Sequence, residues 1–217
     1  MRPGDRPRHH AGTSDAERQI LLATERLLES TPLTELSVAS ILKEAGVSRT
    51  TFYFYFSSKY APVTALLSSV MDQIFEQVSL FTSGPHPGTD TNRLERGLEG
   101  ATQLFREHRM VFRATVEHWH SVTEIGELWL NVIERFTDAF ASEIDRERAA
   151  GTAPLGIPSR ELAAGLIWAS ERLLYVAGLG VDADLPDEDR ALASLLAIWR
   201  GAVYGPSPQS LGPPPDR

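Results

Sequence analysis

Apolar residues recur at helical spacing along almost the whole chain, and this periodicity constrains the fold more than any other feature. The longest run covers residues 122–149, where apolar side chains three and four positions apart form one stripe. Shorter runs of the same kind follow one another from Ser14 to Tyr204, separated by breaks rich in Gly and Pro such as 83–90. We therefore predict an all-α protein of about nine helices.

One short stretch departs from this pattern. Phe and Tyr alternate from Phe52 to Phe56, and strict alternation is typical of a half-buried β-strand. A strand needs a partner, and no other segment combines sustained alternation with hairpin turn residues. Phe52 and Phe56 are four residues apart, so a helix would turn both inward and Tyr53 outward. We prefer the helix, and the faces of Phe54 and Tyr55 near its end stay open.

Composition limits the classes of protein that this chain can belong to. Of its 217 residues, 42% are hydrophobic, which is ample for a packed core. The absence of cysteine excludes disulfides, thiolate zinc sites and cysteine nucleophiles. The first residues have no apolar signal-peptide region, and no uncharged apolar segment reaches the ~20 residues of a spanning helix. We expect a cytoplasmic protein with no membrane partner.

The net charge of −8 is unevenly distributed. Residues 1–60 carry eight Lys or Arg and seven Asp or Glu, whereas residues 61–217 carry thirteen and 22. Both lysines of the protein, Lys43 and Lys59, lie in the first part. An acidic body with a mildly basic head is compatible with DNA contact through the head alone.

Residues 37–53, SVASILKEAGVSRTTFY, have the layout of a helix-turn-helix. Gly46 permits the left-handed backbone of a sharp turn, and a second helix begins at Ser48. In this arrangement the second helix places its N-terminal residues in the major groove of DNA. Its first turn carries Arg49, which can pair bidentately with guanine, and Thr50 and Thr51, which offer a hydroxyl or a methyl group.

Other side chains near these helix starts suit the DNA backbone. The phenols of Tyr53 and Tyr55 and the ammonium of Lys59 are expected to reach phosphates. Ser37 and Ser48 mark helix N-termini, whose free N–H groups bind anions. The predicted DNA-binding residues are Ser37, Ser48, Arg49, Thr50, Thr51, Tyr53, Tyr55 and Lys59.

The segment LSVASILKEAGVSRTTFYFYFSSKYAPV resembles the DNA-binding segment of the TetR family of bacterial transcriptional regulators nearly position by position. Four further segments resemble the larger domain of one ligand-responsive branch of that family: ELW at 127–129, IDRERAAGTAP at 144–154, SERLLY at 170–175 and IWRGAVYG at 198–205. The resemblance covers roughly residues 14–205. It implies three DNA-binding helices, a larger helical ligand-binding domain, and a homodimer built mainly from the last two helices.

We therefore expect a helix-turn-helix DNA-binding domain at 14–60 and a ligand-binding and dimerisation domain at 61–205. Residues 1–13 and 206–217 have the composition of a disordered N-terminal arm and tail.

The aromatic residues of the larger domain allow two interpretations. Stripes of this kind are usually core. They can also line a pocket for a hydrophobic small molecule between helices. The resemblance implies that the pocket is lined by Leu94, Leu98, Phe105, Trp129, Ile133, Phe136, Ile167, Ser170, Glu171, Tyr175 and Trp199.

The resemblance also implies that the last two helices bury apolar residues against a second subunit. Some of these residues must serve the core of their own chain as well, and the sequence cannot divide them. They are Leu166, Ala169, Leu173, Val176, Leu192, Leu195, Trp199 and Val203.

Signatures of enzymes and metal sites are missing from the sequence, and we predict no catalytic residue, metal or cofactor. In EHWH at 117–120, His118 and His120 would point about 200° apart on a helix, so they cannot easily share an ion. We predict a homodimeric transcriptional regulator, most simply a repressor that a hydrophobic small molecule releases from a palindromic operator. An activator of the same fold and a helical small-molecule-binding protein without DNA binding are the alternatives.

Overall fold

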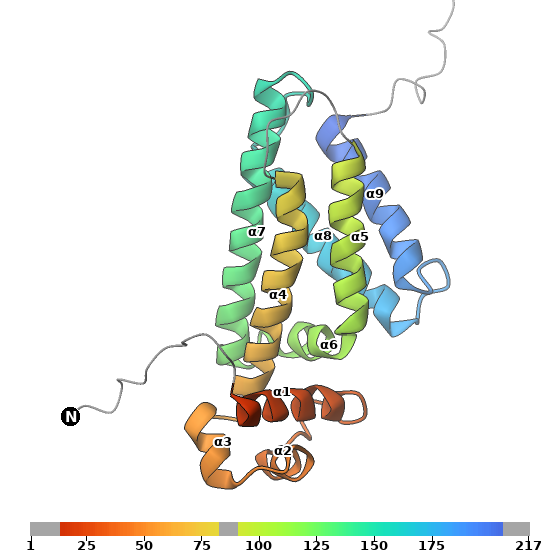
Figure 1. The fold of residues 1–217 in the computed structure, drawn as a ribbon. Coiled ribbons are helices and arrows are strands. Elements are labelled where there is room, and N and C mark those ends of the chain that lie inside the picture. Colours follow the sequence, from red (N-terminus) through yellow and green to blue (C-terminus); the bar gives the residue numbers. More distant parts are fainter. Residues whose placement is uncertain (1–13, 83–90, 206–217) are drawn as a thin grey trace, which may run out of the picture. The chain divides into compact units, whose positions relative to one another are not determined.

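The computed structural model describes residues 14–82 and 91–205, which form nine α-helices and no β-strand (Figure 1). This confirms the all-α prediction. The expectations for residues 1–13, 83–90 and 206–217 lie outside the described residues. The helices are α1 (Asp15–Leu28), α2 (Val38–Ala45), α3 (Arg49–Tyr55), α4 (Ala61–Thr82), α5 (Thr91–Glu107), α6 (Arg109–His118), α7 (Thr123–Ala149), α8 (Ser159–Leu179) and α9 (Glu188–Tyr204).

The chain divides into two compact units between Leu66 and Leu67, inside α4. We call them the N-terminal unit and the C-terminal unit. The sequence places a domain boundary earlier, after residue 60. Helix α4 begins at Ala61 and continues through the division without a break, so its first turns group with the N-terminal unit.

The core of the N-terminal unit is built from helices α1, α2 and α3, with α1 in contact with both of the others. Ile41 of α2 and Phe52 of α3 are fully buried. Phe56 is also buried, and its ring centroid lies 5.8 Å from that of Phe52. Tyr53 and Phe54 turn outward and expose 42% and 71% of their surface. Residues 52–55 of the alternation therefore lie on a helix, as predicted, and Phe56 is its C-cap.

Local side-chain chemistry sets the start of α2 and of α3. The Ser37 hydroxyl accepts a hydrogen bond from the Ser40 amide at 3.1 Å, and the Ser48 hydroxyl accepts one from the Thr51 amide at 3.0 Å. Gly46 ends α2 with a φ of 66°, in the left-handed region that a side chain disfavours. The helix-turn-helix geometry thus follows from two serine caps and one glycine.

Lys59 bridges its own segment to the connection between α1 and α2. Its Nζ donates hydrogen bonds to the backbone carbonyls of Leu33, Thr34 and Leu36 at 3.1, 3.1 and 2.8 Å. An ammonium group has three donors, so these bonds occupy all of them. These bonds compete with the phosphate contact predicted for Lys59, because its charge is held by carbonyl oxygens within the N-terminal unit.

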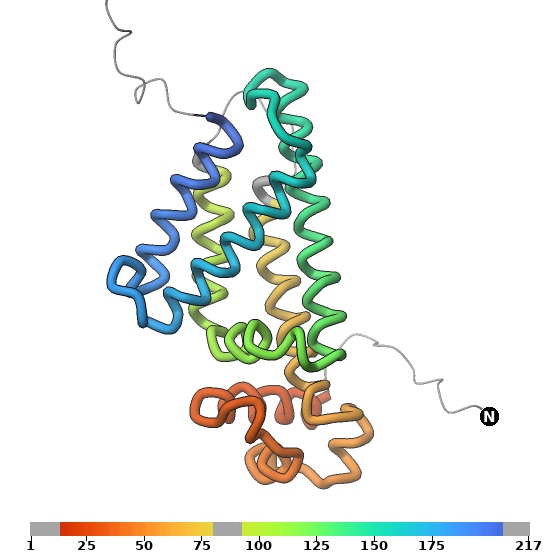
Figure 2. The backbone as a smooth tube through the Cα atoms, turned by 180° about the vertical axis from the view of Figure 1, so that it is seen from behind, coloured from red at the N-terminus to blue at the C-terminus, as the bar shows by residue number. Residues whose placement is uncertain are grey.

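The C-terminal unit is a bundle in which α7 packs against α8, α8 against α9, and α5 against α9. The C-terminal part of α4 runs beside α7 and α5, and α6 lies across one end of the bundle (Figures 1 and 2). Phe112, Ile125 and Leu195 come from three different helices, and each exposes at most 1% of its surface. The core of this unit therefore lies between the helices.

The connection from α6 to α7 passes unusually close to the start of α7. A Cβ atom added to Gly126 would lie 2.3 Å from the carbonyl oxygen of Trp119. Gly126 is buried in the first turn of α7, and the atom that a side chain would meet belongs to the backbone. Only glycine fits at this position.

By length and composition α8 could cross a membrane, and its most apolar window has a mean hydropathy of 1.3; no other helix in the described ranges meets that test. Its residues Ala163, Leu166 and Ile167 are buried inside the C-terminal unit. Glu171 and Arg172 lie near its middle, as the sequence showed. We interpret α8 as a core helix.

Candidate functional site

Helix α3 presents an exposed face made of Arg49, Thr50, Tyr53 and Phe54. The Arg49 guanidinium lies 5.8 Å from the centroid of the Tyr53 ring, within the range of a cation–π contact. Phe54 meets Tyr55 edge to face at 4.8 Å, and Tyr55 itself is half-buried. The sequence singled out Arg49, Thr50 and Tyr53 but left the direction of Phe54 open. Its exposure follows from the single buried position of α3, Phe52.

The serine hydroxyls at the helix starts are bonded within their own helices. Ser48 Oγ accepts from the Thr51 amide and lies 2.8 Å from Thr51 Oγ1. Ser37 Oγ accepts from the Ser40 amide. Each cap satisfies one N–H of a first turn, which leaves other first-turn N–H groups for an anion. These N–H groups are the part of the two caps that suits a phosphate.

An apolar cavity of about 100 Å³ lies within the C-terminal unit, between side chains of α4 to α9. Among the residues that the sequence predicted as ligand contacts, those lining this cavity are Leu98, Phe105, Trp129, Ile133, Phe136, Ile167, Ser170, Glu171 and Trp199. The cavity therefore brings together most of the predicted set.

Other residues of the lining were not predicted. Helix α4 contributes three of them, and no pattern in the sequence shows which helices adjoin a cavity. The stripe that includes Phe136 and Phe140 offered a signal for one more, because it continues along the same face of α7. The unpredicted residues are Met71, Ile74, Val78, Ala101, Thr102, Phe112, Phe140, Leu174 and Leu195.

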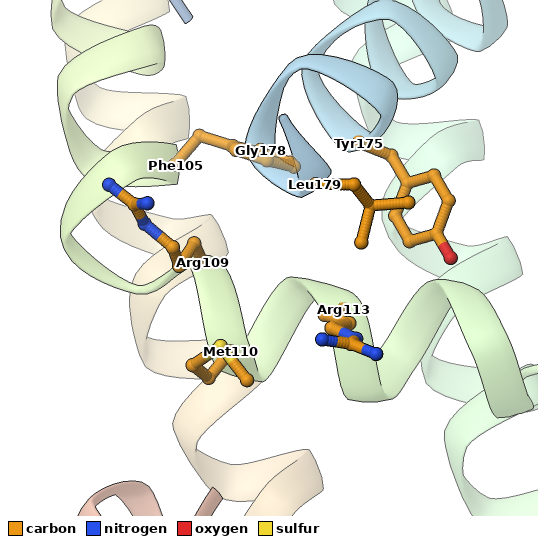
Figure 3. Close-up of a pocket in the computed structure, with 7 residues that line it drawn as sticks. All are labelled: Phe105, Arg109, Met110, Arg113, Tyr175, Gly178 and Leu179. Atoms are coloured by element: carbon orange, nitrogen blue, oxygen red, sulfur yellow. The ribbon is translucent and has the colours of Figure 1, made fainter. Parts of the chain in front are cut away.

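Two predicted residues lie beside the main cavity. Leu94 lines a small void of about 10 Å³ together with Leu98 and Phe140. Tyr175 lines a second cavity of about 80 Å³ (Figure 3). Since Leu98 and Phe140 also line the main cavity, Leu94 supports its wall from behind.

The second cavity lies between the end of α5, helix α6 and the end of α8 (Figure 3). Glu117 Oε1 accepts hydrogen bonds from the Tyr175 hydroxyl at 3.2 Å and from Arg113 Nε at 2.9 Å. Burial, and then the charge of Glu117, raise the pKa of Tyr175. Phe105 lines both cavities. The lining residues are Phe105, Arg109, Met110, Arg113, Tyr175, Gly178 and Leu179.

Polar groups in the wall of the main cavity differ in how they are satisfied. Trp199 Nε1 donates to Ser170 Oγ at 3.0 Å, and Ser170 Oγ donates to the Leu166 carbonyl at 2.8 Å. Within the described residues, Thr102 Oγ1, Trp129 Nε1 and Glu171 Oε1 have no hydrogen-bond partner. The wall of the cavity is therefore mostly apolar, and a few of its residues carry buried polar atoms.

Burial raises the pKa of Glu171, and the nearby charge of Arg172 acts in the opposite direction. The Arg172 guanidinium is largely exposed, and its Nε lies 3.9 Å from Glu171 Oε2. Because the pair is long and half in solvent, burial outweighs it.

Glu171→Gln is expected to reduce the pH dependence of the stability of the C-terminal unit. An acid whose pKa is raised by folding stays protonated in the folded state where the unfolded chain has lost its proton. Its contribution to stability is full below the ordinary pKa of 4.5 and is lost as the pH rises through the raised value. Urea unfolding between about pH 4 and 8 checks this. Glu161→Gln, at an exposed position of the same helix, should leave the profile unchanged. Equal profiles for wild type and Glu171→Gln would contradict the expectation.

Among the described residues, no three His, Cys, Asp or Glu side chains are placed to hold a metal ion. His118 Nδ1 lies 3.0 Å from the Ala114 carbonyl of its own helix. The EHWH segment therefore offers no observation in favour of a metal site.

Comparison with known proteins connects both units to one family. Residues 20–66 match the family model for bacterial regulatory proteins of the tetR family, and residues 94–205 match the model for the C-terminal domain of the transcriptional regulator EthR. The chain is 36% identical over 191 residues to the HTH-type transcriptional regulator EthR of Mycobacterium tuberculosis, which covers 88% of each chain. It is 34% identical over 197 residues to EthR of Mycolicibacterium smegmatis, over 89% of this chain and 88% of that one.

Solved structures show the same fold at lower identity. The regulatory protein TetR from Rhodobacter sphaeroides superposes with a TM-score of 0.66 at 18% identity, over 85% of this chain and 99% of that one. SmeT is the repressor of a multidrug efflux pump of Stenotrophomonas maltophilia. Its complex with triclosan superposes with a TM-score of 0.67 at 17% identity, over 90% of this chain and 99% of that one. These relatives are transcriptional regulators and not enzymes. The chain therefore belongs to the TetR family of bacterial DNA-binding transcriptional regulators, and its C-terminal unit is of the EthR type.

Proposed function

We propose that this regulator is a homodimeric repressor, released from a roughly palindromic operator when a small apolar effector fills the main cavity. The observation that carries the proposal is that cavity, which is walled by apolar side chains from α4 to α9. A DNA-binding unit alone has no need of it. SmeT, a repressor of the same fold, has been solved with triclosan bound, which supports a small-molecule effector. Because a bacterial regulator meets its operator in the cytoplasm, we place the protein there.

The exposed face of α3 supports the DNA contacts that we propose. Arg49 and Thr50 would reach base edges in the major groove, and Tyr53 would meet a phosphate. Arg49 is exposed, and within the described residues it forms no ion pair. Its guanidinium contacts only the Tyr53 ring there, so its N–H groups are accessible to a base. Lys59 has no place in this surface, because its donors are bonded to carbonyls.

Partial exposure along α8 and α9 supports a dimer interface on their outer faces. Of the apolar residues predicted for that interface, Leu166, Leu195, Trp199 and Val203 are buried within their own chain. The others remain partly exposed and are available to a second copy: Ala169, Leu173, Val176 and Leu192. In a dimer built on this face, two α3 helices would meet half-sites about one helical turn apart, or a multiple of it.

The size of the main cavity supports a coupling between effector binding and operator binding. Pockets for drug-sized ligands measure roughly 300–1,000 Å³. At about 100 Å³ the cavity is smaller, so such an effector must displace part of the wall. Met71, Ile74 and Val78 of α4 belong to that wall, and the same helix begins at Ala61 in the N-terminal unit. An effector that binds better when α4 has moved would lower operator affinity by that difference.

Arg49→Ala is expected to weaken binding to the operator by about 1–3 kcal/mol, because a bidentate contact with guanine is lost. Binding to random DNA should change little. The measurement is fluorescence anisotropy of DNA from upstream of the protein's own gene, titrated in parallel with a scrambled duplex of equal length.

Arg160→Ala serves as the control, since it removes the same charge from an exposed position in the C-terminal unit. It should leave both affinities unchanged. Equal losses on operator and scrambled DNA for Arg49→Ala would rule out base reading by Arg49. If wild-type protein shows no sequence-specific, salt-sensitive binding to any upstream fragment, the repressor proposal fails.

A further inference from the structure

Phe54 is the most exposed large apolar side chain among the described residues of the N-terminal unit. Its exposed fraction is 71%, compared with 42% for Leu22 and for Tyr53, whereas Phe52 and Phe56 on either side of it are buried. A single exposed apolar residue is ordinary on a protein surface. The position of Phe54 is not ordinary, because it lies on α3, the helix that a helix-turn-helix places in the major groove.

The exposed face of α3 carries two rows of side chains. Arg49 and Tyr53 are four residues apart and form one row, in which the guanidinium lies 5.8 Å from the ring centroid. Thr50 and Phe54 are also four residues apart and form the neighbouring row. All four residues are exposed. The first row carries hydrogen-bond donors, whereas the second presents a threonine with its methyl group and a phenyl ring.

Tyr55 supports the exposed ring of Phe54 from the side. The two rings meet edge to face with their centroids 4.8 Å apart, and Tyr55 itself is half-buried. An aromatic side chain has only two rotatable bonds, so a ring with a fixed neighbour loses little further freedom when it meets a partner. Phe54 is therefore prepared for a contact outside the N-terminal unit.

The chemistry of the major groove limits what a phenyl ring can recognise there. The ring has no N–H or O–H group to donate to a phosphate or to a base. Among the four bases, only thymine places an apolar group in the major groove, its C5-methyl group, and Phe and the methyl group of Thr are side chains that contact it. Such a contact removes apolar surface of both partners from water. Thymine is therefore the base that the second row suits.

We propose that Phe54 is a specificity-determining residue, which recognises thymine in each operator half-site through the C5-methyl group, with the methyl group of Thr50 beside it. An α-helix rises about 1.5 Å per residue, so the two positions are about 6 Å apart, or about two base-pair steps. The thymines that are recognised should therefore fall within about three consecutive base pairs of a half-site. The inference rests on the part of the proposed function that places α3 in the major groove, and it is independent of any effector.

The test removes the methyl group from the DNA and nothing else. Duplexes that the full-length wild-type protein selects from a random pool define the half-site, and each of its thymines is then replaced in turn by deoxyuridine, which keeps every hydrogen-bonding group. Fluorescence anisotropy compares the affinities of the two duplexes of each pair. We expect a loss of about three- to fivefold at one or two thymines, the value of one buried methyl group. Thymines outside the half-site should show no loss.

Phe54→Ala should bring the ratio of the two affinities to about one at the thymine that the ring contacts. A folding defect would weaken the binding of both duplexes alike, so the ratio reports the methyl contact and not the stability of the variant. Phe54→Leu keeps an apolar side chain and should retain most of the ratio. Leu22→Ala removes an exposed apolar side chain from α1 of the same unit and should leave every ratio unchanged.

Three results would overturn the proposal: equal affinities within every pair for the wild-type protein, a thymine preference that remains in Phe54→Ala, or a pool from which no sequence is selected. The same duplexes separate it from the proposed function. If the thymine preference is found and no apolar compound releases the selected duplex, the role of Phe54 stands and release by an effector fails. If such a compound releases the duplex and every pair binds equally, the proposed function stands and thymine recognition fails.

Discussion

Lys59→Met is expected to lower the free energy of unfolding of the N-terminal unit by about 2–4 kcal/mol, because two part-buried carbonyls lose a charged donor. The carbonyls of Leu33 and Leu36 lie in part-buried surroundings, whereas that of Thr34 is exposed and can turn to water. Methionine keeps the length and apolar stem of lysine, so little packing is lost. Amide hydrogen exchange of residues 29–45, followed by mass spectrometry, would show faster exchange there.

The only other lysine provides a matched control. Lys43 is exposed on α2 of the same unit, and Lys43→Met removes the same charge. Both variants should flatten the salt dependence of DNA binding to a similar, small extent, but only Lys59→Met should speed hydrogen exchange. If Lys59→Met left exchange unchanged and reduced the salt slope on its own, the phosphate contact first predicted for Lys59 would be restored.

Gly126→Ala is expected to destabilise the C-terminal unit by about 3–5 kcal/mol, at the upper end of what single substitutions cost. The added methyl group would lie 2.3 Å from the Trp119 carbonyl oxygen, which is backbone and cannot rotate away. Either α6 or the first turn of α7 must shift. Urea unfolding followed by far-UV circular dichroism measures the loss.

Gly100→Ala makes the same chemical change where the neighbour can yield. Its new Cβ would meet only the Gln77 side chain, at 3.1 to 3.3 Å, and that side chain is exposed. We expect a change of about 1 kcal/mol or less, since the helix propensity of alanine offsets the crowding. Similar losses for both variants would show that Gly126 is not limited by the close approach.

Local signals in the sequence were enough to predict the helices of the N-terminal unit. Ser37 and Ser48 cap their helices, and Gly46 has the positive φ that ends α2. The spacing of Phe52 and Phe56 chose helix over strand correctly, because both rings are buried. These features depend on residues within four positions of one another, which a sequence displays directly.

The bonds from Lys59 to backbone carbonyls could not be predicted in this way. Its partners are backbone carbonyls more than twenty residues earlier, and a carbonyl is present whatever side chain the residue carries. An exposed-looking lysine after a recognition helix therefore suggested phosphate. Only the three-dimensional structure shows that the carbonyl oxygens of the loop between α1 and α2 surround the ammonium group of Lys59.

The residues that line the main cavity could be predicted only at positions where the chain resembles the family. Trp129, Phe136 and Trp199 were assigned to it through that resemblance, and they line it. Met71, Ile74 and Val78 were missed, because periodicity shows that one face of α4 is buried without showing what it is buried against. Tyr175 lines the second cavity instead of the main one, and its hydroxyl bonds to Glu117 on α6.

The tryptophans described above have a spectroscopic consequence. All four tryptophans of the protein, at 119, 129, 168 and 199, fall within the C-terminal unit, and two of them line the main cavity. The N-terminal unit has tyrosines but no tryptophan. Intrinsic emission excited near the red edge of the indole band therefore arises from the C-terminal unit alone. Binding of a cavity ligand and binding of DNA can thus both be followed with unlabelled protein. Indole emission reports the first, and the anisotropy of a labelled duplex reports the second.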